Sequence, residues 1–308
     1  MTDLYVVTGA GPVGWTVAEQ LAEQGHSVRV LTRSGSGPDH PLVERRTVDV
    51  SDPAQLGEAF EGAKGIFHCI HGSAYAASTW AKELPKAERI VLEAAGEAGA
   101  VVVFPESLYS YSEPDKTMAE HSPRDARDGK RGIRTALLNM RSASATDTVS
   151  VVAGDFFGPR VRAAHAGERM VPTLLAGKGV QVIGSAEKPH SFTYVPDLAA
   201  AMIKAAQTPS LWNRVWHAPT GPALTQRSIA TSFAVAAGVE TPKVSAVPGW
   251  ILRAAGVFST GMRELAEILY QFERPFVMDS RVSQEALALK PTPHHEAARA
   301  TVTWWREQ

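Results

Sequence analysis

The sequence is poor in several features that mark particular classes of protein. It has one cysteine, Cys69, among 308 residues, so no disulfide can form within the chain. Cys69 lies in an apolar run, which is typical of a buried, unreactive thiol. No apolar stretch is long enough to span a membrane, and the first apolar run is too short for a signal peptide. These absences predict a cytoplasmic protein without a membrane partner.

An excess of charge is also absent. The chain has 31 Lys and Arg against 32 Asp and Glu, for a formal net charge of −1, so we expect no nucleic-acid partner. The histidines lack the spacing of zinc ligands, and we expect no metal. With 44% hydrophobic residues the chain can bury a large core. We therefore expect a small-molecule substrate and a monomer or homodimer.

A glycine-rich turn lies near the N-terminus. The motif G-A-G-P-V-G at residues 9–14 follows an apolar strand at 4–7 and opens an amphipathic helix that ends near Gly25. A second strand is expected at 28–32. A lone glycine motif is weak evidence, but a strand before it and a helix and strand after it are the context of a dinucleotide site. The alternative is a glycine turn without a ligand.

The residues of this turn have separate expected roles. Gly9 permits the tight turn, Gly11 lets the backbone approach the pyrophosphate, and Gly14 lets the helix pack on the strand. Pro12 and Val13 begin the helix, whose free N–H groups face the anion. All five residues are predicted to bind the cofactor.

The end of the second strand indicates which cofactor this is. An NAD site usually has an acid about 20 residues after the glycines, to hold the ribose 2′-hydroxyl. No Asp or Glu occurs between Glu23 and Asp39, and Arg33 stands at the strand end instead. A guanidinium there can bind a 2′-phosphate. We therefore predict NADP and regard NAD as the less favoured cofactor, the alternative being that Arg33 is an ordinary solvated cation.

Strand-like and helix-like segments alternate through the first half, which predicts an α/β Rossmann-type doubly wound parallel sheet. Further strands are expected at 46–50, 65–70, 100–104 and 150–153, with Asp52 and Pro53 starting a short helix. After residue 157 the pattern changes. We predict a cofactor domain at 1–157 with returning segments at about 191–217, and a smaller substrate lobe at 158–190 and 218–308.

With these segments placed, nearly the whole chain resembles an extended or atypical short-chain dehydrogenase/reductase of the NAD-dependent epimerase/dehydratase group. The stretches that carry the resemblance are 8–14, Asp49-Val50, 104–111, 154–159, 191–197 and 291–304. In this family the segment corresponding to Asp49 and Val50 approaches the adenine. The motifs are specific for fold and cofactor, but not for substrate.

The chain departs from this family at the general acid. Typical members carry Tyr-x-x-x-Lys on the helix after the fifth strand, and none of the 6 tyrosines here has a lysine four residues later. Lys130 stands where the tyrosine would lie, and Arg134 where the ribose-binding lysine would lie, one helical turn apart.

A lysine at this position also resembles the isoflavone and phenylcoumaran benzylic ether reductase branch, in which it is the general acid/base. We predict that role for Lys130, with Arg131 and Arg134 favouring loss of its proton. The alternative is that Lys130 and these arginines form a solvated cationic face.

Other candidates follow the strands. The resemblance places Ser107 and Tyr109 against the reacting oxygen, as further catalytic candidates, and Tyr111 near the substrate. The alternative for Tyr109 is that it only packs against the cofactor. His71 follows the fourth strand, beneath the nicotinamide ribose, and is predicted to contact cofactor and substrate.

Three more expectations concern polar residues elsewhere. His190 and Tyr194 are expected to border the substrate pocket. His68 is expected to be a core histidine, and Asp197 a helix cap.

These features together predict an NADP(H)-dependent reductase of a small or medium organic carbonyl or conjugated substrate. A non-redox isomerase, cyclase or lyase on the same fold is the alternative, since the usual acid is missing. A cofactor-sensing regulator without catalysis is the third possibility.

Overall fold

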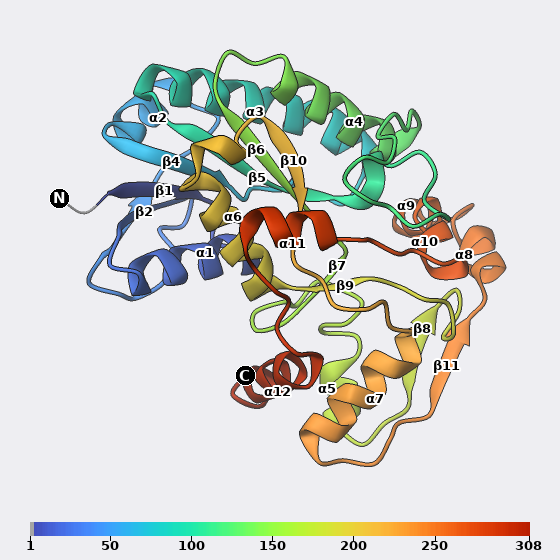
Figure 1. Ribbon diagram of the computed structural model, residues 1–308. Helices are drawn as coiled ribbons and strands as arrows, with labels where there is room; N and C mark the ends of the chain where they lie inside the picture. Colours follow the sequence, from blue (N-terminus) through green and yellow to red (C-terminus); the bar gives the residue numbers. More distant parts are fainter. Residues whose placement is uncertain (1–2) are drawn as a thin grey trace.

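The computed structural model describes residues 3–308 and is built around a seven-stranded parallel sheet in the order β10-β6-β5-β4-β1-β2-β3 (Figure 1). The strands are β1 (Leu4–Thr8), β2 (Ser27–Thr32), β3 (Val43–Thr47), β4 (Ala63–His68), β5 (Val101–Ser107), β6 (Thr148–Ala153) and β10 (Arg214–His217). The predicted Rossmann-type α/β fold is confirmed.

Helices cover both faces of this sheet (Figure 1). One face carries α1 (Pro12–Glu23) and α6 (Val195–Ala206), and the other carries α2 (Pro53–Phe60), α3 (Ala77–Ala98) and α4 (Gly129–Ser142). Successive strand residues point to opposite faces, so Val6 and Val7 enter different cores. Burial on both faces explains why these strands read as continuous apolar runs.

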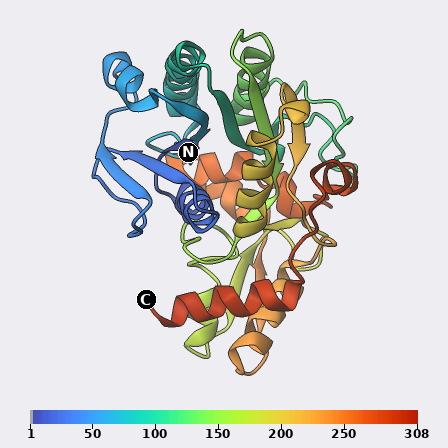
Figure 2. The ribbon, with the colours of Figure 1, turned by 60° about the vertical axis from the view of Figure 1, so that its left-hand side comes forward.

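A second lobe lies below the carboxyl ends of the strands (Figure 2). Its core gathers around Phe157, Phe233 and Trp305. Its elements are β8 (Val180–Ile183), β11 (Val244–Val247), α5 (Val171–Leu175), α7 (Gln226–Ala237) and α12 (His294–Arg306).

Short elements join the two parts. β7 (Asp155–Phe157) pairs with β9 (Phe192–Tyr194), and the chain then returns to the large sheet through α6, the 3₁₀ turn η2 (Pro209–Leu211) and β10. Another 3₁₀ turn, η1 (Leu108–Ser110), follows β5. The helices α8 (Gly249–Ala255), α9 (Thr260–Glu267) and α10 (Tyr270–Glu273) lie beside the start of α4 (Figure 1).

Three expectations need correction. The third strand is Val43–Thr47 rather than 46–50, because it is a sheet edge whose charged residues hide the apolar signal. Helix α11 (Arg281–Leu287) packs on α6 and β10, so this part of 218–308 belongs with the large sheet. Asp197 does not cap α6, because its carboxylate accepts hydrogen bonds from Thr292 N (2.8 Å) and Oγ1 (2.6 Å).

Candidate active site

The turn between β1 and α1 has the shape of a dinucleotide cradle. Gly9 has a φ of +88°, which favours glycine, and a Cβ on Gly14 would lie 2.0 Å from the Gly9 carbonyl oxygen. A Cβ on Gly11 would meet no atom within 4 Å. Gly11 is also the residue before α1, where no side chain caps the free N–H groups. Open space at an uncapped helix N-terminus fits the phosphates of a nicotinamide dinucleotide.

Pro12 and Val13 contribute to this cradle in different ways. Pro12 occupies the first turn of α1. Val13 is 6% exposed and its side chain lies in the core, so only its backbone is available to a cofactor. Of the contacts expected for Val13, only those of its main chain with the cofactor therefore remain as a prediction.

Three further residues with expected cofactor contacts lie just after neighbouring strands. Arg33 follows β2, and Asp49 and Val50 lie just beyond β3. Arg33 is exposed at the end of β2, and among residues 3–308 no ion pair or hydrogen bond occupies it. Asp49 accepts hydrogen bonds from Ser51 N (2.9 Å) and Oγ (2.7 Å), which, together with the charge of Arg33, lower the pKa of its carboxyl. Val50 is half-buried against the core beneath α2. Arg33 is therefore free to meet an anion.

Lys130 lies inside the protein, at the start of α4. It is 0% exposed, and its ammonium donates to Glu264 Oε2 and to Glu267 Oε2 (2.8 Å). The Lys130 amide also donates to Glu267 Oε1 at 2.7 Å. The alternative of a solvated cationic face is wrong for this residue. The groups that contact the ammonium are therefore two carboxylates and not the neighbouring arginines that we expected.

Aromatic side chains pack beside this ammonium. Lys130 Nζ lies 4.8 Å from the ring centroid of Tyr75 and 5.9 Å from that of Trp80. The hydroxyls of Tyr75 and Tyr109 are 2.8 Å apart, and the Tyr109 ring stacks on Trp80 at 6.3 Å. Burial raises the pKa of Tyr109 well above its ordinary value, so its hydroxyl stays protonated. Arg134 lies 4.9 Å from the Trp80 ring centroid. The structure thus brings Lys130, Tyr109 and Arg134 together around Trp80.

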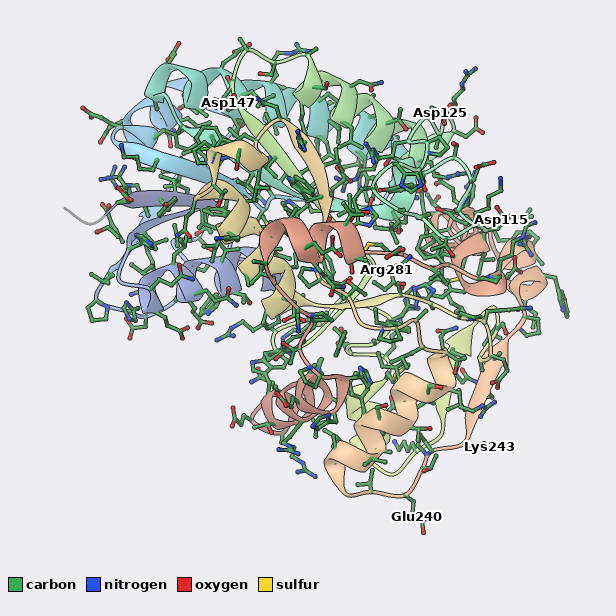
Figure 3. All side chains as sticks on the ribbon, in the orientation of Figure 1. Asp115, Asp125, Asp147, Glu240, Lys243 and Arg281 are labelled. Carbon is green, nitrogen blue, oxygen red and sulfur yellow. The ribbon has the colours of Figure 1, made fainter. Side chains whose placement is uncertain are left out.

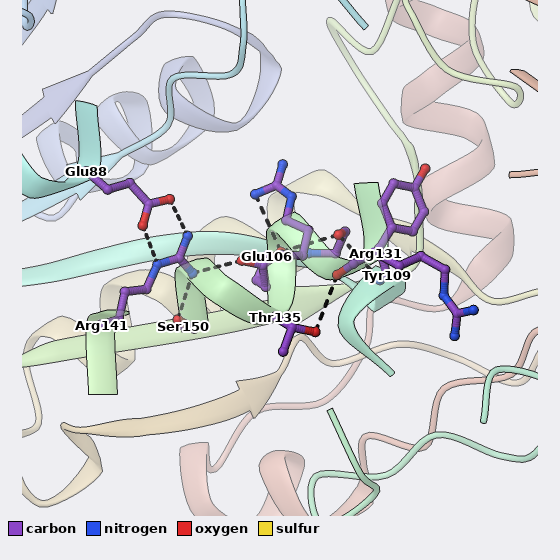
Figure 4. A network of polar contacts seen from close by, with 9 residues as sticks. Glu88, Glu106, Tyr109, Arg131, Thr135, Arg141 and Ser150 are labelled. Carbon is purple, nitrogen blue, oxygen red and sulfur yellow. Dashed lines mark hydrogen bonds and ion pairs between the residues drawn. The ribbon is translucent and has the colours of Figure 1, made fainter. Parts of the chain in front are cut away.

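A buried chain of alternating charges lies behind this group (Figure 4). Arg141 donates to Glu106 Oε2 at 2.8 Å, and its Nε donates to Glu88 Oε2 at 2.8 Å. Glu106 Oε1 lies 3.5 Å from Arg134 Nη1. Burial opposes ionisation of Glu106, but Arg134 and Arg141 outweigh it and hold its pKa below the ordinary value. The opposite charges are paired inside the fold, as buried charges require.

Ser107 is held by the same carboxylate. Its amide and Oγ donate to Glu106 Oε1 at 2.7 and 3.3 Å, and the Oγ also accepts from the Tyr109 amide at 3.5 Å. Glu106 therefore positions both Ser107 and Arg134.

Two of the predicted substrate residues lie away from Trp80. Tyr111 is 1% exposed, and its hydroxyl is 2.5 Å from His217 Nε2, because η1 turns the chain inward after Tyr109. The expectation that Tyr111 reaches substrate is therefore corrected. The Tyr194 ring packs 5.4 Å from that of Phe157 in the second lobe.

The histidines lie in contrasting surroundings. His71 is exposed but packs edge-on against Trp80 at 4.6 Å, and desolvation, followed by the charge of Arg134, lowers its pKa to about 4. His68 is 4% exposed and bonds Thr8 Oγ1 at 2.8 Å, which confirms it as a core histidine. His190 is 1% exposed and lies between Gln271 and Asp155.

Several residues of this site were not predicted from the sequence. Glu264 and Glu267 lie on a helix more than a hundred residues from Lys130, and no sequence pattern pairs them. Glu106 carries a weak signal, a lone charge at the end of an apolar strand. Tyr75 carries no signal that separates it from an ordinary loop residue. Asp155 lies within the 154–159 stretch that carries the family resemblance, but no pattern singled it out there.

Residues 3–308 lack both a membrane span and a cluster of metal ligands. No helix there is long and apolar enough to cross a membrane. The same residues contain no group of three or more His, Cys, Asp or Glu side chains suited to a metal ion.

Comparison with known proteins identifies the family. Residues 5–215 match the model of the NAD dependent epimerase/dehydratase family. The chain belongs to this family. Uncharacterized protein y4nG of Sinorhizobium fredii is 24% identical over 210 residues, which are 65% of this chain and 52% of that protein. This chain therefore matches about half the length of that relative.

Solved structures of family-like proteins share the fold. The UDP-glucose 4-epimerase of Thermotoga maritima, solved with UDP-glucose, is 18% identical with a TM-score of 0.76 over 99% of both chains. WbmH of Bordetella bronchiseptica, solved with NAD⁺, is 17% identical with a TM-score of 0.77 over 100% of this chain and 99% of its own. The resemblance to the NAD-dependent epimerase/dehydratase group is confirmed by the family match. Family membership supports an enzyme of this type with a nicotinamide cofactor.

Proposed function

We propose that this chain is an NADP(H)-dependent reductase of a small or medium organic carbonyl or conjugated compound. The observation that supports the proposal is the buried Lys130 ammonium, which lies 5.9 Å from the ring centroid of Trp80. The resemblance assigns Lys130 to the position of the family's tyrosine. A reductase needs a proton held beside the reacting oxygen, and Lys130 Nζ and the Tyr109 hydroxyl are the groups that hold one there.

The cofactor supplies a hydride when it is bound. Gly9, Gly11 and Gly14 leave room for its phosphates at α1, and Arg33 is free to bind a 2′-phosphate. The resemblance assigns the adenine to Asp49 and Val50, and the nicotinamide ribose to His71 and Arg134. We further propose that the large sheet binds the cofactor, and that the second lobe with α8–α10 covers the substrate.

The proton route follows from the contacts of Lys130. The ammonium donates hydrogen bonds to Glu264 and Glu267. A substrate oxygen that takes the place of one carboxylate would receive a hydrogen bond from Nζ and then its proton. Tyr109 is the second donor, because its hydroxyl is kept protonated beside Tyr75.

A non-redox isomerase, cyclase or lyase is the second candidate function. The observation that favours it is the same pair of carboxylates, since a paired ammonium provides a fixed charge more readily than a mobile proton. Such an enzyme would convert its substrate without net change in the cofactor.

Absorbance at 340 nm separates these functions. We expect the protein to oxidise NADPH faster than NADH in the presence of a panel of ketones, aldehydes and conjugated enones. Substrate turnover at constant absorbance would instead support the second function. Binding of NADPH without any turnover across the panel would contradict both enzymatic proposals and favour a regulator.

A further inference from the structure

An apolar surface lies on α8 and on the turn that joins it to α9, at the outer edge of the molecule (Figure 1). This α8 surface consists of Trp250, Ile251, Val257 and Phe258, which are 68%, 40%, 74% and 93% exposed. None of the four packs in an apolar core among residues 3–308. A single exposed apolar residue is ordinary, whereas a contiguous group marks a surface that binds a partner or a membrane.

Helical spacing places these four side chains together. The backbone keeps a helical course beyond α8, because the amide of Gly256 donates to the Leu252 carbonyl at 2.9 Å and that of Ser259 donates to the Ala255 carbonyl at 3.1 Å. Positions 250, 254 and 258 therefore lie above one another, with 251 and 257 beside them. Positions 249, 252 and 256 lie on the opposite side and are buried.

The buried side fixes α8 against its neighbours. Leu252 packs in a core with Ile268, Leu269 and Phe272. A Cβ on Gly256 would lie 3.1 Å from the Cα of Arg263, so the end of α8 lies directly against α9. A helix that is apolar on both sides is normally covered on both. The outer side of α8 therefore needs an occupant from outside residues 3–308.

The size of the α8 surface favours a lipid layer over a second copy of the chain. An aromatic side chain buries about 150–250 Å², so Trp250 and Phe258 together supply less than about 500 Å². Ile251 and Val257 are smaller. A stable protein interface takes about 800 Å² from each partner. A second copy covering only this surface would bind weakly, whereas a bilayer can enclose a small protruding surface completely.

The charges beside this surface match anionic lipid. Residues 241–263 contain Lys and Arg but no Asp or Glu. Glu240 and Lys243 lie near the tip of the second lobe, away from α8 (Figure 3). Closer to α8, Arg253 donates to Glu273 at 3.0 Å, and the carboxylates of α9 bind the ammonium inside the fold. Arg263 is exposed and has no ion pair among residues 3–308. An unpaired cation therefore lies against the end of the apolar surface.

The backbone of the turn is also suited to an apolar layer. The amide of Val257 donates to the Ala254 carbonyl at 3.3 Å, and that of Phe258 donates to the Ala255 carbonyl at 3.1 Å. Donors that are paired within the segment lose no hydrogen bond to water when they enter lipid. Trp250 adds a ring of the type that prefers the level of the lipid headgroups.

We propose that the α8 surface attaches the protein to the face of a membrane that contains anionic lipids. Val257 and Phe258 enter the acyl chains, and Arg263 contacts lipid phosphates. We expected no membrane partner because the sequence lacks a spanning segment, but attachment to one face of a bilayer needs none. The proposal does not depend on the reaction that the protein catalyses.

Flotation with lipid vesicles tests this attachment in the unaltered protein. One set of vesicles is phosphatidylcholine alone, and the other is an equal mixture of phosphatidylcholine and phosphatidylglycerol. The bound fraction is measured as the lipid concentration rises. We expect the protein to bind the mixed vesicles more tightly than the neutral ones, and high salt should reduce this difference.

A matched pair of substitutions connects the binding to the α8 surface. Val257 and Val235 are 74% and 73% exposed, but Val235 lies on α7 in the second lobe. Val257→Ser should weaken vesicle binding about fivefold and Phe258→Ser at least about tenfold, because each removes an apolar side chain from the lipid. Val235→Ser should leave it unchanged. Arg263→Gln should weaken binding to the mixed vesicles alone, about fivefold.

Two results with vesicles would overturn the proposal: no binding of the unaltered protein to the mixed vesicles, or equal binding by Val257→Ser and Val235→Ser. The first does not depend on whether any variant folds, and circular dichroism checks the variants. Sedimentation velocity without lipid tests the other occupant. A dimer that Phe258→Ser separates into monomers would show that a second copy covers the α8 surface, and would overturn the assignment to lipid.

Discussion

Lys130 and Arg134 show how much a side chain's role depends on what surrounds it. Both stand on α4 at the spacing of the family's Tyr and Lys, yet Lys130 contacts carboxylates of α9, and Arg134 contacts Glu106 and Trp80. Arg134 also has a buried Nε without a partner, which leaves a donor available to a ribose or substrate oxygen. The residue types alone would have allowed a solvated face instead.

Lys130→Met tests the proton donor. We expect the variant to keep NADPH binding, because the cradle lies on other elements, and to lose turnover by roughly 10²- to 10⁴-fold, as is typical when a general acid is removed. Steady-state kinetics with NADPH and titration of NADPH binding measure the two effects separately.

Tyr109→Phe is the matched control, because it removes only a hydroxyl from the same aromatic group. It should slow turnover less than Lys130→Met does. If Tyr109→Phe is the damaging change and Lys130→Met retains nearly full turnover at every pH, the phenol is the donor.

Arg33→Ala tests the choice of cofactor. Only NADPH has the 2′-phosphate, and one charge-assisted contact is worth on the order of 1.5–3 kcal/mol, so NADPH affinity should fall about ten- to hundredfold. Affinity for NADH should change little. Fluorescence titration with both cofactors measures this, and Arg33→Lys, which keeps the charge but not the planar fork, should lie between. An equal loss for both cofactors would show that Arg33 is structural.

Among the helices, α9 is held in place partly by ion pairs rather than by buried side chains. No residue of α9 is fully buried, whereas Glu264 and Glu267 tie it to Lys130 and to the amide of Ala77. Its attachment to the large sheet therefore depends more on polar contacts than on apolar packing.

The double substitution Glu264→Gln and Glu267→Gln should loosen α9. We expect amide hydrogens of residues 260–267 to exchange at least about tenfold faster, because local opening no longer breaks two ion pairs. Hydrogen exchange with mass spectrometry measures this. Arg263→Gln is the control on the same helix, and its exchange should stay close to that of the unaltered protein. Unchanged protection in the double variant would show that packing alone holds α9.

At the scale of the whole molecule, buried histidines make stability depend on pH. Burial, followed by the charge of Arg141, lowers the pKa of His68 from 6.5 to about 3. Between these values the unfolded chain binds a proton that the folded chain does not, so lowering the pH favours unfolding. His165, with a pKa lowered to about 4 chiefly by burial, acts in the same direction.

The free energy of unfolding should therefore fall as the pH drops below 6.5, with His68 contributing up to about 1.4 kcal/mol per pH unit. Urea denaturation at pH 6.5, 5.75 and 5 measures the slope in a range where most carboxyls stay ionised. His68→Gln keeps a polar partner for Thr8 and should make the slope shallower. An unchanged slope would mean that His68 does not titrate between the two states.

The sequence by itself determined the parallel sheet, the glycine turn before α1 and the spacing of Lys130 and Arg134 on α4. Each is a local property: alternation of strands and helices, three glycines within one turn, and residues four apart on one helix. Edge strand β3 was misplaced because its charged side chains face solvent, and no local pattern marked its ends. The family also followed from these local signals alone.

Only the tertiary structure decided what surrounds the predicted site residues. Glu264 reaches Lys130 from 134 positions along the chain, and Gln271 reaches His190 from 81. Such contacts depend on how the chain after residue 157 folds back over the ends of the strands. The periodicity of helices and strands relates only residues that are close in sequence, so it does not predict them. Burial then sets the charge of each group, because desolvation acts on a residue only after its neighbours are in place. The sequence thus determines which ionisable side chains are present. The fold determines which of them come into contact and which are protonated.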